Sequence, residues 1–234
     1  MQNGPGGIYA SSDGGKEWVM VSDTKQSWYS IATDDSGQFV YAATFYEHVY
    51  VSTDYGNVFD IIDSLATVEV SQWGGIATSS SGQYVYVSTF DNTVYSSGDF
   101  GGTFSVSGSI SPSSDARFLD TIATSSSGQY VYVAGQASGY IYRSEDYGVT
   151  WQSNNSPNAD WSGITSSSSG EIVYASVYSG AASPYKGIYK SMDYGEIFEE
   201  VSVDDDNYSF NTITTSSDAG TVYTANGQYV YVLK

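Results

Sequence analysis

Short runs in which residue character alternates are spread along the whole chain. The clearest are Tyr84–Val87 and Tyr130–Val133, which both read Tyr-Val-Tyr-Val. An alternation with a period of two is typical of β-strands. Turn-forming Ser, Gly, Asn and Asp residues separate the runs, and no stretch combines good helix formers with a helical period. The pattern therefore predicts an all-β chain of short antiparallel strands.

The runs are grouped in fours. One such group consists of Trp73–Thr78, Tyr84–Ser88, Thr93–Ser97 and Gly102–Val106. Four antiparallel strands in every 40 to 50 residues, roughly, are typical of the blades of a β-propeller.

Two repeated motifs mark these groups. The first reads Ser-x-Asp-x-Gly-x-x-aromatic, and its Asp residues are 41, 45, 47 and 47 residues apart. Its five copies contain Asp13, Asp54, Asp99, Asp146 and Asp193. The second motif, which covers both Ile76–Val87 and Ile122–Val133, has degenerate copies that begin at Ile31, Ile164 and Ile213. Five interleaved copies of each predict a five-bladed propeller of four-stranded antiparallel blades, a single domain over residues 1–234.

The first motif resembles the Asp-box, or BNR, repeat, whose pattern is Ser-x-Asp-x-Gly-x-Thr-Trp. Ser144–Trp151 matches every position of that pattern. The resemblance is to the repeats of sortilin-type and sialidase-type propellers. It implies that each box lies between the third and fourth strands of a blade, where its Asp accepts hydrogen bonds from its own loop. The five Asp residues are therefore expected to be structural, and the repeat itself does not specify a function.

The two ends of the chain have to share one blade. The chain begins with a third and a fourth strand, Ile8–Ser11 and Glu17–Val21. It ends with a first, a second and a third strand, at Asn211–Thr215, Thr221–Thr224 and Tyr229–Leu233. We expect N- and C-terminal strands to pair and close the ring, with one third strand left over. That strand is either added to the last blade or donated to a neighbouring molecule in a homo-assembly.

Charge and composition narrow the classes of function. Seven basic and 26 acidic residues give a net charge of −19, which disfavours binding to nucleic acids and to anionic membranes. The chain has no Cys and one His, and no apolar run is long enough to span a bilayer. Residues 1–6 do not read as a signal peptide. The acidic, Cys-free, Tyr- and Ser-rich composition nevertheless favours an extracellular or cell-surface protein.

A ligand site is expected on the side of the propeller where the loops vary. These loops connect the second strand of a blade to the third, or the fourth strand to the next blade. They carry the candidate ligand-binding residues Phe45, Tyr46, Glu47, His48, Phe90, Asp91, Tyr178 and Tyr185. The aromatic members would offer a stacking surface for a glycan, and His48 beside Glu47 is a candidate general base or an ordinary loop residue.

Two classes of function remain open at this point. The first is a non-catalytic module that binds a glycan or a protein, or takes part in a structural assembly. The second is a glycoside hydrolase or lyase, which needs two carboxylates roughly 5–10 Å apart. Its candidates are Glu47, Asp91, Asp115 and Asp160, and solvated loop charges explain them equally well. A sialidase is excluded, since that family uses three Arg and this chain has only Arg117 and Arg143.

No cofactor is expected, with one qualification. The acidic run Asp204, Asp205 and Asp206 follows Glu199 and Glu200 in a predicted loop. Such a run is either a solvated loop or a weak Ca²⁺ site without EF-hand spacing.

Overall fold

The structure is a computed structural model of the whole chain. It describes residues 6–70, 72–108, 110, 118–136, 139–178, 185–201, 209–226 and 228–233. The predicted all-β architecture is confirmed, because the described strands form six antiparallel sheets. A single short helix among these residues, α1 (Asp63–Ala66), lies in the connection after the first four-stranded sheet.

Four of the sheets have four strands each and are called blades 1 to 4. Blade 1 consists of β3 (Trp28–Thr33), β4 (Val40–Thr44), β5 (Val49–Ser52) and β6 (Asp60–Ile61). Blade 2 consists of β7 (Trp73–Thr78), β8 (Val85–Thr89), β9 (Val94–Ser97) and β10 (Ser105–Val106). Blade 3 consists of β11 (Phe118–Thr124), β12 (Val131–Gln136), β13 (Tyr142–Ser144) and β14 (Gln152–Ser153). Blade 4 consists of β15 (Trp161–Ser166), β16 (Val173–Val177), β17 (Ile188–Ser191) and β18 (Glu199–Val201).

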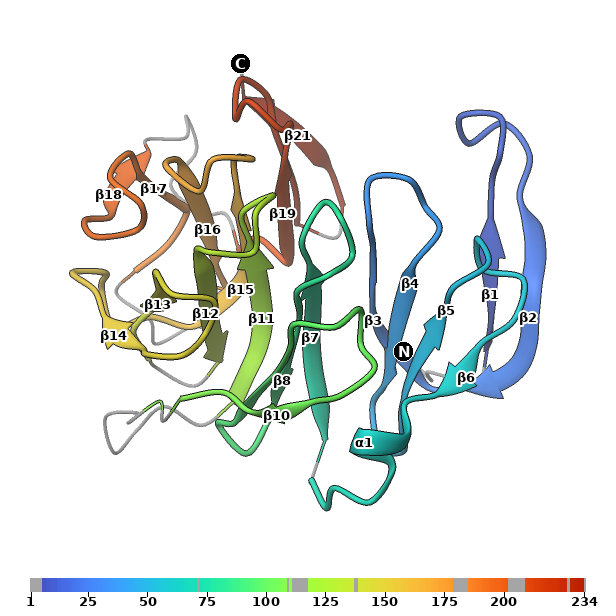
Figure 1. Cartoon of the computed structure of the whole chain (residues 1–234). Helices are drawn as coiled ribbons and strands as arrows, with labels where there is room; N and C mark the ends of the chain where they lie inside the picture. Colours follow the sequence, from blue (N-terminus) through green and yellow to red (C-terminus); the bar gives the residue numbers. More distant parts are fainter. Residues whose placement is uncertain are drawn as a thin grey trace.

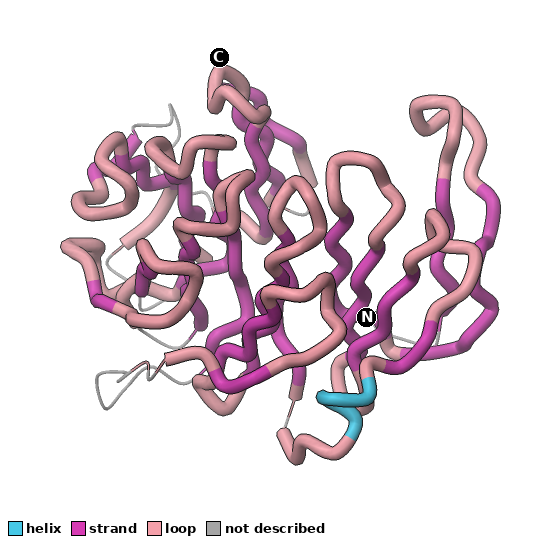
Figure 2. Tube along the Cα trace, in the orientation of Figure 1, coloured by secondary structure: helices cyan, strands magenta, loops and turns pink. Residues whose placement is uncertain are grey.

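The ends of the chain form two smaller sheets. The N-terminal hairpin pairs β1 (Gly6–Ala10) with β2 (Val19–Gln26). The C-terminal sheet consists of β19 (Thr212–Thr215), β20 (Val222–Ala225) and β21 (Val230–Leu233). Successive first strands pack beside one another in the order β3, β7, β11, β15 and β19, so the sheets follow a curved path (Figure 1). Loops join the strands at both ends of each sheet (Figure 2).

The core lies between the faces of neighbouring sheets. Every residue of β8 and β16 is buried, because each second strand is covered on both faces by adjacent blades. This explains why Tyr and Val alternate in these strands with no polar face. The indole rings of Trp73 and Trp161 are fully buried at the start of their blades.

Main-chain hydrogen bonds join the turns between the first and second strands of successive blades. In this series each amide N–H donates to the carbonyl oxygen of the next turn, over N···O distances of 2.7–2.9 Å. The donors and acceptors, in order, are Asp35, Ser80, Ser126, Ser168 and Ser217. Because the same bond recurs at each step, it holds the rotation from one blade to the next.

A buried tyrosine adds a second repeated contact between blades. The Tyr41 hydroxyl of blade 1 donates to the Gly82 carbonyl of blade 2 over 3.0 Å. The equivalent bonds, both 2.7 Å long, join Tyr86 to the Gly128 carbonyl and Tyr132 to the Gly170 carbonyl. Each of these rings is fully buried.

The expected closure by terminal strands differs from what the described residues show. The N-terminal hairpin and the C-terminal sheet are separate sheets, and none of their strands pairs with a strand of the other. The four complete blades are therefore accompanied by a two-stranded and a three-stranded sheet, and a ring of five equivalent blades is not seen. β1 and β21 both take the third place in a blade, so pairing of the two ends requires a five-stranded sheet, and the described residues form none.

Candidate functional site

The five Asp boxes have one shared geometry, shown well by the box of blade 2. Ser97 Oγ donates to Asp99 Oδ1 over 2.7 Å, and the Thr103 amide donates to the same oxygen over 2.8 Å. Thr103 Oγ1 donates to Asp99 Oδ2 over 2.7 Å. These bonds from Thr103 and Ser97 lower the pKa of Asp99. Phe100 and Gly101 both have positive φ, which aims the loop amides at the carboxylate.

The other four boxes are built in the same way. In each of them a Ser hydroxyl donates to Oδ1 of Asp13, Asp54, Asp146 or Asp193. Each carboxylate also accepts two amide N–H groups or an amide and a hydroxyl from its own loop. The five Asp side chains are therefore occupied in separate loops and do not converge on one site.

An aromatic cluster lies on the variable side of blades 1 to 3. Phe45 has its ring centroid 5.1 Å from Tyr29, 4.6 Å from Tyr46 and 5.4 Å from Phe90. Phe90 in turn lies 5.4 Å from Phe118. Tyr46, Tyr29 and Phe118 remain 63%, 41% and 39% exposed, so the aromatic cluster presents apolar surface to solvent.

A cavity of about 380 Å³ adjoins the aromatic cluster. The first strands of several sheets surround it, and the ends of two second strands complete its wall. We call it the axial cavity. Its lining consists of Tyr29, Ser30, Asp120, Thr121, Gln136, Ser162, Tyr178 and Asn211. Tyr29 belongs to both features, so the aromatic cluster and the axial cavity are continuous.

Asp120 is the carboxylate of the axial cavity. Its Oδ2 accepts a 2.6 Å hydrogen bond from Gln136 Nε2 and a 3.5 Å contact from the Tyr29 hydroxyl. Its Oδ1 is buried and has no hydrogen-bond partner among the described residues. Burial raises the pKa of Asp120 to about 6, against the opposing effect of the Gln136 bond. Burial and the nearby Asp120 carboxylate also raise the pKa of Tyr29.

A buried oxygen without a partner is costly unless a donor reaches it. Asp120 Oδ1 is itself closed to solvent, so Asp120 would meet a ligand hydroxyl or amide group through the atoms that line the cavity. Around it, Tyr29, Gln136 and Asn211 supply further donors and acceptors. An apolar surface next to a few converging polar groups is the usual composition of a small-molecule site.

The structure brings four of the predicted ligand-binding residues to this place. Phe45, Tyr46 and Phe90 belong to the aromatic cluster, and Tyr178, 51% exposed, lines the axial cavity. The main-chain carbonyl of Asp160 accepts a 2.7 Å hydrogen bond from the Tyr178 amide, which holds this end of β16.

The other predicted residues lie elsewhere, outside the lining of the axial cavity. Glu47 is exposed, and its amide donates to Thr44 Oγ1 over 3.0 Å. His48 is half-buried with its ring edge-on to Tyr50, so it is not an ordinary surface residue. Burial and the nearby Asp91 carboxylate raise the pKa of Tyr95, which places Asp91 near the outer part of blade 2.

Further predicted residues lack a place in this site. Tyr185 is 36% exposed and lies near Tyr189. The pKa of Tyr189 is raised mainly by burial, then by the Glu200 carboxylate, and least by Tyr185. Asp115 and Asp204–Asp206 fall outside the described residues, so the hydrolase candidate and the Ca²⁺ candidate at these positions stay predictions. Within the described part of the chain, no group of three or more His, Asp or Glu is arranged to hold a metal ion.

Sequence reasoning missed Tyr29, Phe118, Asp120, Gln136 and Asn211. A signal for three of them was present in the second motif. The position two residues before its Ile varies strongly, and in chain order it holds Tyr29, Gly74, Asp120, Ser162 and Asn211. Four of these five residues line the axial cavity. Variation at this position of the repeat would therefore have pointed to the wall of the cavity.

Comparison with protein families and known structures agrees with this architecture. The family model described as BNR-Asp box repeat matches residues 141–153, the box of blade 3. The chain therefore carries an Asp-box repeat at this position. No curated protein sequence gives a significant match. The described residues also include no helix long and apolar enough to cross a membrane.

The solved structures similar to this chain differ in function by their titles. The chain resembles a GH74 xyloglucanase from Xanthomonas campestris, with a TM-score of 0.74 and 12% identity over 99% of this chain and 41% of that one. A GH74 enzyme from Niastella koreensis gives a TM-score of 0.71 and 16% identity over 94% of this chain and 37% of that one. The structure of YCF48 bound to D1 peptide gives a TM-score of 0.64 and 12% identity over 91% of this chain and 66% of that one. The Asp-box chain thus spans about two fifths of the two GH74 proteins, and these similarities establish the fold alone.

Proposed function

We propose that this Asp-box protein is a non-catalytic binding module that holds a neutral glycan on its variable side. The observation that carries the proposal is the continuity of the aromatic cluster with the axial cavity, which Asp120 lines together with Tyr29 and Gln136. Sugar rings have apolar C–H faces that pack on aromatic rings, and hydroxyls that pair with carboxylate, amide and phenol groups. The site offers both kinds of contact side by side.

Charge selects the class of glycan. A net charge of −19 repels sulfated, phosphorylated and uronic-acid-rich polymers, so a neutral polysaccharide or oligosaccharide is the better partner. The Asp120 carboxylate is also better matched by hydroxyl donors than by an anion.

Binding is favoured over hydrolysis by the number of carboxylates. Glycoside hydrolysis generally requires a pair of them, roughly 5–10 Å apart. The axial cavity has Asp120 as its one carboxylate among the described lining residues. The GH74 enzymes are glycoside hydrolases by their titles, but at 12–16% identity their activity does not transfer to this chain.

The test begins with a screen of neutral polysaccharides by affinity electrophoresis and a glycan array, with and without Ca²⁺. A matched pair of variants follows. Phe118→Ala removes a ring of the aromatic cluster that is 39% exposed, whereas Phe100→Ala removes a 42% exposed ring from an Asp box. Loss of an aromatic anchor should weaken binding by about tenfold in Phe118→Ala. Phe100→Ala should bind like the unmodified chain.

The opposite results would exclude the proposal. They are equal affinity in the two variants, or binding to acidic glycans only. If the protein releases reducing sugar and Asp120→Asn abolishes that release, the protein is a hydrolase and not a binding module. An extracellular or cell-surface setting is part of the proposal and rests on composition.

A further inference from the structure

Each contact between complete blades has two halves, which we call the knob and the cradle. The knob is the buried Tyr of a second strand. The cradle is formed by two glycines of the next blade, one in its first turn and one in its Asp box. Tyr41 lies in such a cradle, where its hydroxyl reaches the Gly82 carbonyl and a Cβ added at Gly101 would lie 2.9 Å from its ring. The other knobs and cradles are Tyr86 with Gly128 and Gly148, and Tyr132 with Gly170 and Gly195.

Blade 1 has a cradle without a knob. Its glycines are Gly37, in the first turn, and Gly56, in the Asp box. A Cβ added at Gly37 would meet no atom within 4 Å, whereas at Gly82 it would meet Phe39 at 3.0 Å. Ile31, on the first strand beside this cradle, is 57% exposed. Its counterparts Ile76, Ile122, Ile164 and Ile213 are 5–8% exposed.

The C-terminal sheet has a knob without a cradle. Tyr223 lies on β20 one residue after Val222, as Tyr86 follows Val85 on β8. The Tyr223 ring is 46% exposed, although Tyr86 is fully buried. The series of hydrogen bonds between turns ends on the same sheet, since Ser217 accepts from Ser168 and is its last member.

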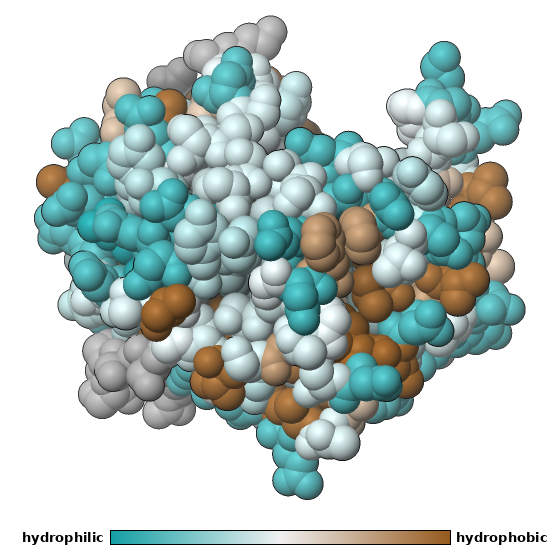
Figure 3. Space-filling view, viewed as in Figure 1, coloured by the Kyte–Doolittle hydropathy of each residue, from teal (hydrophilic) through white to brown (hydrophobic). Residues whose placement is uncertain are grey.

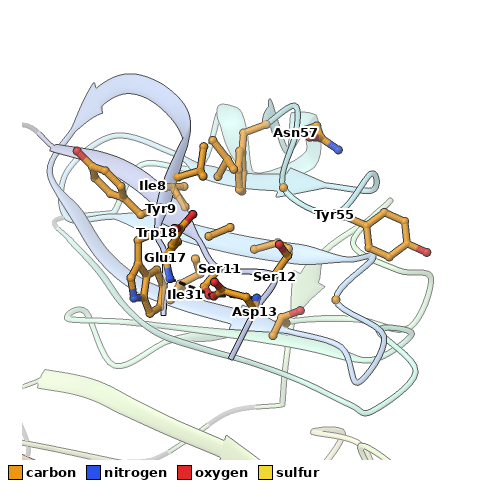
Figure 4. A pocket seen from close by; sticks show the side chains of 18 of the residues that line it. Ile8, Tyr9, Ser11, Ser12, Asp13, Glu17, Trp18, Ile31, Tyr55 and Asn57 are labelled. Carbon is orange, nitrogen blue, oxygen red and sulfur yellow. Dashed lines mark hydrogen bonds between the residues drawn. The ribbon is translucent and has the colours of Figure 1, made fainter. Parts of the chain in front are cut away.

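The empty cradle opens into a large cleft. This cleft, of about 830 Å³, lies between the N-terminal hairpin and blade 1. Figure 4 shows Tyr9 and Trp18 of the hairpin on one side of the cleft and Ile31 and Tyr55 among the blade 1 residues around it. In the space-filling view the tip of the hairpin projects from the body and leaves a notch beside it (Figure 3). The hairpin supplies two outer strands here, and the space for two inner strands is open.

We propose that the C-terminal sheet of a second copy of this chain docks in this cleft, with its Tyr223 knob in the cradle of Gly37 and Gly56. The Tyr223 hydroxyl then donates to the Gly37 carbonyl, and the Ser217 amide donates to the Asp35 carbonyl. Both bonds continue the contact that already joins blade to blade within the chain.

A second copy fits better than the chain's own end. The repeated bonds between turns hold the rotation per blade, and at that rotation the two terminal sheets of one chain remain separate sheets. The knob and the cradle lie on opposite terminal sheets, so the contact is heterologous and each copy can accept one neighbour and dock on another.

Docking has one geometric consequence at the outer strands. β21 and β1 both take the third place in a blade, so they meet edge to edge. The hairpin then has to move outward by about one strand spacing, roughly 4.8 Å. It can do so because β1 and β2 form their own sheet and have no ladder to blade 1. The result is a five-stranded sheet shared by two copies, in which the facing edges of β1 and β21 are no longer open.

The test is the mass in solution, measured by light scattering and sedimentation over a range of concentrations. The unmodified chain should rise from 25.1 kDa towards multiples of that mass. Tyr223→Ser removes the knob and Ile31→Glu blocks the cleft with a charge, so each variant alone should remain monomeric. An equimolar mixture of the two should form dimers and stop there, because one variant keeps an intact cleft and the other an intact knob.

Matched controls separate docking from general surface effects. Val106→Glu and Val149→Glu change residues that are 64% and 67% exposed and do not line the cleft, and both should assemble like the unmodified chain. Unfolding curves for all variants confirm that each is folded. A monomer at every concentration would overturn the proposal, as would assembly of either single variant or a mixture without dimers.

Discussion

Replacing Tyr86 by Phe tests whether the buried tyrosines hold the blades together. The ring is fully buried between blades 2 and 3, and its hydroxyl donates to the Gly128 carbonyl over 2.7 Å. The substitution keeps the ring and removes one oxygen, so the packing is nearly unchanged. What is lost is the bond, and the Gly128 carbonyl is left buried without its donor.

The expected cost follows from that loss. A buried polar group without its partner costs about 1–3 kcal/mol of unfolding free energy. For a chain of this length that corresponds to a melting temperature lower by roughly 2–12 °C. Urea unfolding followed by tryptophan fluorescence gives the free energy, and calorimetry gives the temperature. Tyr223→Phe is the matched control: it changes the same strand position in a half-exposed ring, so it should alter stability by less than about 0.5 kcal/mol in the monomer.

The reasoning would be refuted by equal losses in Tyr86→Phe and Tyr223→Phe. It would also be refuted by an unchanged Tyr86→Phe protein, since the bond between blades would then contribute nothing.

Three further predictions concern the cavity, an Asp box and the core. The raised pKa of Asp120 means that the folded state disfavours its charged form, so the free energy of unfolding should fall as pH rises from about 4 to 6. Asp120→Asn should remove this slope and increase the free energy of unfolding by on the order of 1–3 kcal/mol above pH 6. Urea unfolding at several pH values measures both effects. The lowered pKa of Asp99 has the opposite sign, so Asp99→Asn should be less stable at neutral pH, and the difference should vanish as pH falls below the usual Asp range. Ile76→Ala should cost about 2–5 kcal/mol, whereas Ile31→Ala at the equivalent but exposed position should cost less than about 0.5 kcal/mol by thermal unfolding.

Repetition made the fold accessible from the sequence. The spacing of the Asp boxes and the alternation at Tyr84–Val87 together predicted four short strands per unit, and the strands of blade 2 begin and end within a few residues of the predicted ones. The arrangement of the ends was not accessible in the same way. Whether β1 and β21 share a blade depends on the rotation between sheets, which many contacts such as the Tyr86 bond determine together.

The site was accessible only in part. The loops that differ among repeats drew attention to Phe45 and Phe90, whose rings lie together in the aromatic cluster, because variable loops lie on one side of a propeller. Asp120 was missed because it belongs to a strand, where a lone carboxylate looks like an ordinary polar position. Its significance comes from burial and from the contact with Tyr29, 91 residues away in the chain. The lesson from this chain is that a repeat should also be searched for strand positions that vary.

The most direct test of the binding account is a crystal structure of the protein with a neutral oligosaccharide chosen from the polysaccharide screen. We predict that a sugar ring packs on the aromatic cluster and that one of its hydroxyls donates to the Asp120 carboxylate in the axial cavity. An oligosaccharide bound on the side of the Asp boxes, or an axial cavity that stays empty under saturating ligand, would contradict the account.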